Sequence, residues 1–92
     1  MILNSFLSSV TAVSLAVRGR RLPTQLEFER LLEAMEHQLS LYADTDAIPK
    51  DVVRGLLDLV SMMLMHAPDN EDESRLIEMY VEIDELAMRL IP

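Results

Sequence analysis

Two histidines are the residues of this chain best suited to chemistry, and both fall in segments with helical periodicity. His37 follows Glu33 by four residues, a spacing that places an imidazole and a carboxylate side by side on a helix. Such a pair can bind a metal, but di-iron bundles use Glu-x-x-His pairs, and residue 34 is alanine. We interpret Glu33 and His37 as a solvent-exposed ion pair and predict no metal site and no cofactor.

A histidine on a small helical bundle also suggests phosphotransfer, with His37 or His66 accepting a phosphoryl group. In phosphotransfer domains an exposed His is followed closely by Lys and Gly. Here His37 is followed by Gln-Leu-Ser-Leu and His66 by Ala-Pro, so the surroundings do not match. We keep a phosphotransfer-like module, or a small helical enzyme using His37 or His66, as the alternative function.

The carboxylates give no stronger signal. A calcium loop beginning at Asp69 requires Gly at its sixth position and Glu at its twelfth, where this chain has Ser74 and Tyr80. Glu78, Glu82 and Glu85 are neighbours at helical spacing, but general acid catalysis needs a desolvated cleft, which nothing opposite them suggests. We therefore predict no catalytic residue and no enzymatic activity.

Composition narrows the class of protein. The chain has 92 residues, half of them hydrophobic, a net charge of -8 and no cysteine, which predicts one folded domain over residues 1–92 in the cytoplasm. An acidic surface argues against nucleic-acid binding and favours a basic partner. The apolar N-terminal stretch is interrupted by Ser, Thr and Asn and is too short to span a bilayer, so we predict no membrane association.

Apolar residues recur at three- and four-residue spacing in four segments, which we predict to be helices at about 2–18, 24–42, 49–66 and 71–90. Gly19 is expected to end the first helix with a positive φ. Capping boxes are expected at Thr24 with Glu27 and at Asn70 with Glu73. The short linkers favour a small all-α, antiparallel four-helix bundle.

The segment from Val52 to Met65 is apolar on nearly every side, and the last helix also has a second apolar arc. We expect one arc of each to enter the core, together with Met63 and Met79, and the other to remain free for association. Gly55 would let another helix approach closely. The predicted partner-binding residues are Val52, Gly55, Leu59, Met62, Met65, Ile77, Val81 and Met88.

These observations lead to one functional hypothesis. We expect a non-enzymatic protein-protein interaction module, such as an adaptor, a secretion-type chaperone or a protein inhibitor, that masks a hydrophobic or basic segment of another protein. We also expect a homodimer joined through the spare faces of the third and fourth helices, because a monomer would leave apolar side chains in water.

Overall fold

In the computed structural model, every regular element within the described residues is helical. The structure describes residues 2–42 and 48–90, with side chains from residue 6 onward. The helices are α1 (Ile2–Arg18), α2 (Gln25–Leu41), α3 (Lys50–His66) and α4 (Glu73–Leu90), and a short 3-10 helix, η1 (Ala67–Asp69), precedes α4. The predicted bounds differ from these by at most two residues, and the all-α four-helix architecture is confirmed.

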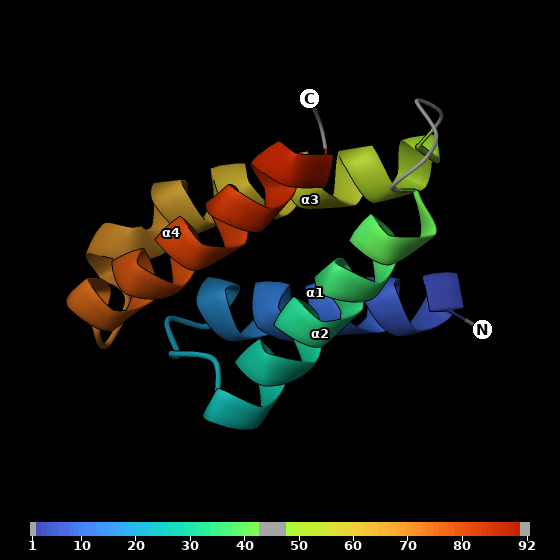
Figure 1. Cartoon of the computed structure of the whole chain (residues 1–92). Coiled ribbons are helices and arrows are strands. Elements are labelled where there is room, and N and C mark those ends of the chain that lie inside the picture. Colours follow the sequence, from blue (N-terminus) through green and yellow to red (C-terminus); the bar gives the residue numbers. More distant parts are fainter. Residues whose placement is uncertain (1, 43–47, 91–92) are drawn as a thin grey trace.

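The helices form two antiparallel hairpins, α1–α2 and α3–α4, laid against each other (Figure 1). Successive helices alternate in direction, as expected. Their order around the bundle differs from chain order, because α1 packs against both α2 and α3, and α4 also packs against both. Within the described residues, α2 and α3 therefore occupy diagonally opposite corners of the bundle. The two main neighbours of α3 are α1 and α4, and they cover different sides of it.

The core lies between the hairpins and receives side chains from all four helices. Met63 and Met79 are buried, as predicted. A Leu, Val or Met side chain contributes roughly 1.5–3 kcal/mol when fully removed from water, so this cluster holds the fold together. Its larger members are Phe6, Val13, Val17, Phe28, Leu31, Met35, Val52, Leu56, Leu59, Met63, Leu76, Met79, Ile83 and Leu90.

The C-terminal end of α1 is closed by a hydrogen-bonding pattern of the Schellman type. The Arg21 amide donates to the Ala16 carbonyl at 2.9 Å and the Arg20 amide donates to the Val17 carbonyl at 3.0 Å. The residue with positive φ is Arg20, at 60°, and Gly19 has no positive φ. The prediction of a positive φ at Gly19 is wrong because the Gly19 amide still donates a helical hydrogen bond to the Leu15 carbonyl, at 3.0 Å, and the chain turns at Arg20.

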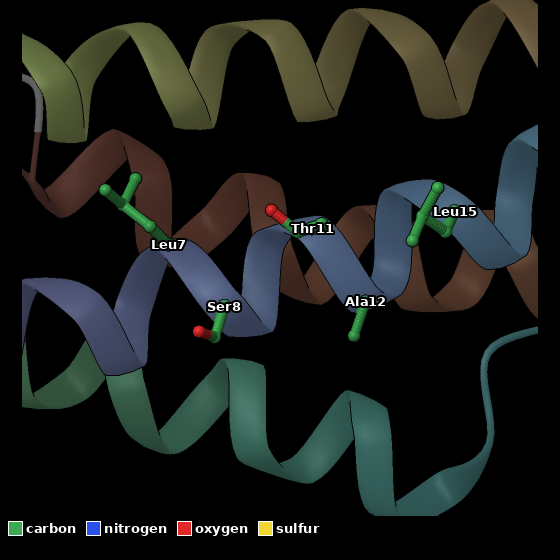
Figure 2. Close-up of a pocket in the computed structure, with 5 residues that line it drawn as sticks. All are labelled: Leu7, Ser8, Thr11, Ala12 and Leu15. Atoms are coloured by element: carbon green, nitrogen blue, oxygen red, sulfur yellow. The ribbon is translucent and has the colours of Figure 1, made fainter.

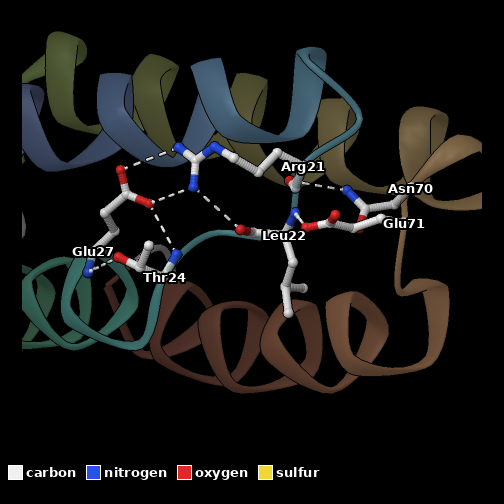
Figure 3. Close-up of polar contacts among 6 residues, drawn as sticks. All are labelled: Arg21, Leu22, Thr24, Glu27, Asn70 and Glu71. Carbon is white, nitrogen blue, oxygen red and sulfur yellow. Dashed lines mark hydrogen bonds and ion pairs between the residues drawn. The ribbon is translucent and has the colours of Figure 1, made fainter.

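The start of α2 has the predicted capping box. The Glu27 amide donates to Thr24 Oγ1 at 3.1 Å, and the Thr24 amide donates to Glu27 Oε1 at 2.8 Å (Figure 3). Arg21 Nη1 lies 3.1 Å from the same Glu27 oxygen. The hydrogen bond from Arg21, followed by that from the Thr24 amide, lowers the pKa of Glu27, and the same contact raises the pKa of Arg21.

The start of α4 differs from the prediction. Asp72 caps the helix, since its Oδ1 accepts a hydrogen bond from the Arg75 amide at 3.1 Å. Asn70 Oδ1 instead accepts from the Asp72 amide at 3.1 Å. The expected capping box of Asn70 with Glu73 is therefore wrong, because an Asx turn at Asn70 moves the helix start two residues along the chain.

Hydrogen bonds join the loop after α1 to the loop after α3 (Figure 3). Asn70 Nδ2 donates to the Arg21 carbonyl at 3.1 Å, and the Glu71 amide donates to the Arg20 carbonyl at 3.1 Å. The Leu22 amide donates to Glu71 Oε1 at 2.8 Å. These contacts hold the end of α1 beside the end of α3, and they fix which side of α3 is covered by α1.

Candidate protein-interaction surface

One side of α3 faces α1. A Cβ atom built on Gly55 would lie 3.8 Å from Leu7 Cδ2 and 3.8 Å from Phe6 Cε2, both on α1. Gly55 thus lies against another helix, as its sequence context suggested, but that helix belongs to the same chain. Gly55 thus marks the side of α3 that faces α1, and the direction of every other α3 side chain follows from its angle to Gly55 around the helix axis.

Three of the predicted partner-binding residues are buried near this side. The exposed fractions of Val52, Leu59 and Met62 are 0%, 1% and 8%. Arg18 of α1 donates from Nε to the Met62 sulfur at 3.3 Å. The prediction that these three side chains lie on a free face is wrong, because α1 covers this arc of α3.

A small groove runs along this junction between α1 and α3. It has a volume of about 250 Å³, and its lining includes Thr11, Ser14 and Arg18 of α1 and Asp58 and Met62 of α3. The lining also includes the buried core residues Val10 and Leu59 and the exposed Leu15. The α1-facing side of α3 is therefore largely occupied by intramolecular packing.

The opposite side of α3 faces away from α1. Successive helical residues are about 100° apart, so Leu57, two residues after Gly55, lies nearly opposite to it. Leu64 follows Leu57 by two helical turns and lies on the same stripe. These leucines are 55% and 53% exposed, while Val53 and Val60 on this stripe are half-buried. Because α4 is the other neighbour of α3, the stripe runs along the α3–α4 junction.

The matching side of α4 is located by Arg75. Its guanidinium lies 5.7 Å from the Phe28 ring centre and donates to Gln25 Oε1 at 3.3 Å, so Arg75 faces α2. Ile77 lies two residues further on and therefore points away from α2, toward the α3 side. Ile77, Val81 and Met88 follow one helical stripe and are all exposed.

Together these residues form a two-helix apolar surface, which we call the outer patch: Leu57, Leu64, Ile77, Val81 and Met88. Its α4 residues are exposed, as predicted, whereas Leu57 and Leu64 were not among the residues predicted to remain free. Met65 is 72% exposed, as expected of a surface residue, but it lies about 100° from Leu64 in the direction away from α4. The signal that could have located the α3 half is Gly55, whose missing side chain favours close packing on the opposite side.

Charges of opposite sign border the outer patch. On α3, Lys50 and Arg54 extend the stripe of Leu57 toward the start of the helix, and both are exposed. On α4, Glu78 and Glu85 flank Val81 and are also exposed. Glu78 forms an ion pair with Arg75 at 3.3 Å, whereas Arg54 and Glu85 have no ion pair within the described part of the chain. The patch is thus basic on its α3 border and acidic on its α4 border.

A second exposed surface lies on α1. Leu7, Ser8, Thr11, Ala12 and Leu15 line a shallow hollow on the side of α1 that faces solvent (Figure 2). All five come from one helix, and none carries an ionisable side chain. This face offers small hydroxyl and apolar groups but no residue suited to catalysis.

The histidines lie apart from both surfaces. His37 and Glu33 are exposed on α2, and His66 is half-buried in the last turn of α3. No group of three or more His, Cys, Asp or Glu side chains suited to a metal occurs in residues 2–42 and 48–90. The alternative function through His37 or His66 stays a prediction.

Among the residues whose side chains the structure describes, Gln38 is the one buried polar residue, and the sequence analysis did not identify it. It is 1% exposed on the core side of α2, and its Oε1 has no hydrogen-bond partner within the described structure. It continues the stripe of Phe28, Leu31 and Met35, so its position in the helical period was the available signal. Neither hollow described above includes it.

Among the described helices, none combines the length with the apolar character that a membrane crossing requires. Comparisons of the chain with protein-family models, curated protein sequences and solved structures found no significant match.

Proposed function

We propose that this protein is a non-enzymatic interaction module that covers a hydrophobic segment of another protein with the outer patch. The observation that supports this proposal is the gathering of Leu57, Leu64, Ile77, Val81 and Met88 along one helix junction. Each side chain gains roughly 1.5–3 kcal/mol on full burial, so joint burial would supply a large part of an association free energy.

The outer patch suits an amphipathic helix, whose apolar stripe would lie along the exposed leucines of α3 and the exposed apolar residues of α4. The acidic border at Glu78 and Glu85 and the net charge of -8 favour a partner helix with basic flanks, because opposite charges speed association. Adaptors, secretion-type chaperones and protein inhibitors act in this way. We place this role in the cytoplasm, since a chain without cysteine needs no oxidising compartment.

A defined probe tests the proposal. We expect a fluorescein-labelled amphipathic peptide of leucine and lysine to bind the protein saturably in a fluorescence anisotropy titration. Leu57→Glu should weaken this binding at least about tenfold, which corresponds to about 1.4 kcal/mol, because it places a charge in the centre of the apolar contact.

Leu26→Glu is the matched control. Leu26 on α2 and Leu57 on α3 are both leucines with an exposed fraction of 55%, and the same new charge is introduced at each position. Leu26→Glu should bind the peptide like the wild type, since Leu26 lies outside the outer patch. No binding by the wild type, or equal losses in the two variants, would rule out the outer patch as the binding surface.

A further inference from the structure

We infer that the outer patch also binds a second copy of this chain, in a symmetric dimer in which α3 of each subunit packs against α4 of the partner subunit. This inference deepens the proposed function, since it names one occupant for the same surface. It rests on how the charges at the two borders are placed along the helices.

Arg54 and Glu85 hold corresponding positions on the two helices of the α3–α4 hairpin. Arg54 precedes His66, the last residue of α3, by 12 residues, and Glu85 follows Glu73, the first residue of α4, by 12 residues. Both helices rise about 1.5 Å per residue, so each residue lies about 18 Å along its helix from the end that adjoins the α3–α4 connection, which contains η1. They stand on opposite borders of the outer patch, with the exposed apolar side chains and the half-buried Asp84 between them.

A twofold axis parallel to the helices places the basic border of one subunit against the acidic border of the other. Such an axis keeps each residue at its level and brings α3 of one subunit over α4 of the other. Arg54 then meets Glu85 of the partner subunit, and the symmetric contact forms on the other border. Leu64 likewise approaches Ile77 of the partner subunit at the level of the turn. A twofold axis across the helices would place α3 over α3 and would not pair Arg54 with Glu85.

Charge reversal tests this arrangement. By light scattering we expect the wild type to be a dimer, and Arg54→Glu and Glu85→Arg to dissociate at concentrations at least about tenfold higher, because each puts two like charges together. An equal mixture of the two variants should recover the dimer mass, since both contacts then join opposite charges. Arg30→Glu, on the exposed side of α2, should remain as dimeric as the wild type.

Cysteine pairing gives a second measurement that does not depend on charge. The chain has no cysteine, so Arg54→Cys and Glu85→Cys each introduce a single thiol. Mixed and oxidised, they should form a covalent heterodimer in preference to either homodimer. A monomeric wild type, or preferential pairing of Arg54→Cys with itself, would overturn the inference. Peptide binding by such a monomer would still support the proposed function, so the two failures are distinguishable.

Discussion

Both sides of α3 are apolar, but one side is buried and the other is exposed. The side toward α1 carries Gly55, Leu59 and Met62, and it is covered by Phe6, Leu7 and Arg18 of the same chain. The side away from α1 carries Leu57 and Leu64, which remain about half exposed. Hydrophobicity therefore does not decide which side is buried; the position of α1 does. Leu57 and Leu64, which α1 does not cover, remain available to a partner.

The largest expected effect is the difference in stability loss between alanine variants of the buried Leu59 and the exposed Leu57. Leu59→Ala should lower the free energy of unfolding by about 2–5 kcal/mol, because it empties a fully packed site. Leu57→Ala should change it by no more than about 0.5 kcal/mol, as expected at an exposed position. Urea denaturation of both variants, in solutions dilute enough to exclude self-association, measures the two values. Equal losses would show that α3 is rotated relative to the structure.

Gly55 tests how closely α1 packs on the covered side of α3. Gly55→Ala should raise the free energy of unfolding by about 1 kcal/mol, because alanine is the better helix former and the added methyl lies at ordinary contact distance, 3.8 Å, from Phe6 and Leu7. Thermal unfolding followed by circular dichroism measures the gain. A loss of stability would mean that α1 lies closer to α3 than the structure shows.

The smallest effect concerns Glu27, whose contacts fix the loop that follows α1. Its pKa is lowered in the folded state, so its contribution to stability is present above its ordinary pKa of about 4.3 and is lost as the pH falls through the folded value. The difference in free energy of unfolding between wild type and Glu27→Gln should thus be largest near neutral pH and shrink in acid. Urea denaturation across this pH range measures it.

Arg21→Gln is the matched control for Glu27, because it removes the main cause of the lowered pKa and keeps the carboxylate. It should reduce the pH dependence in the same direction as Glu27→Gln. Parallel loss of stability in the wild type and both variants over the whole range would contradict the Arg21–Glu27 contact.

Much of the fold was predictable because it depends on local sequence. The helix bounds follow from apolar periodicity, and the capping box at Thr24 follows from the residue types at two positions. The C-terminal end of α1 was less accessible, because Arg20 adopts a positive φ that glycine usually provides. Asp72 was missed as a cap because Asn70 and Glu73 offered an equally good local pattern.

The surface was only half predictable. Ile77, Val81 and Met88 lie on an arc clearly separate from the main stripe of α4, so their exposure could be read from the period. In α3 both arcs are apolar, and periodicity ranks neither above the other. Periodicity therefore did not support choosing Val52, Leu59 and Met62 as the free arc, and Gly55 indicated a close helix there without showing that it belongs to the same chain; the structure shows that this arc is buried.

The sequence alone determined that this protein has four amphipathic helices and more apolar surface than one small core can bury, because these properties depend on residue type and spacing. Only the tertiary structure decided that α1, held by the contacts of Asn70 and Glu71, covers one side of α3 and leaves the other beside α4. The physical reason is that burial depends on which helices are neighbours, and neighbours are fixed by contacts between residues about fifty positions apart in the chain.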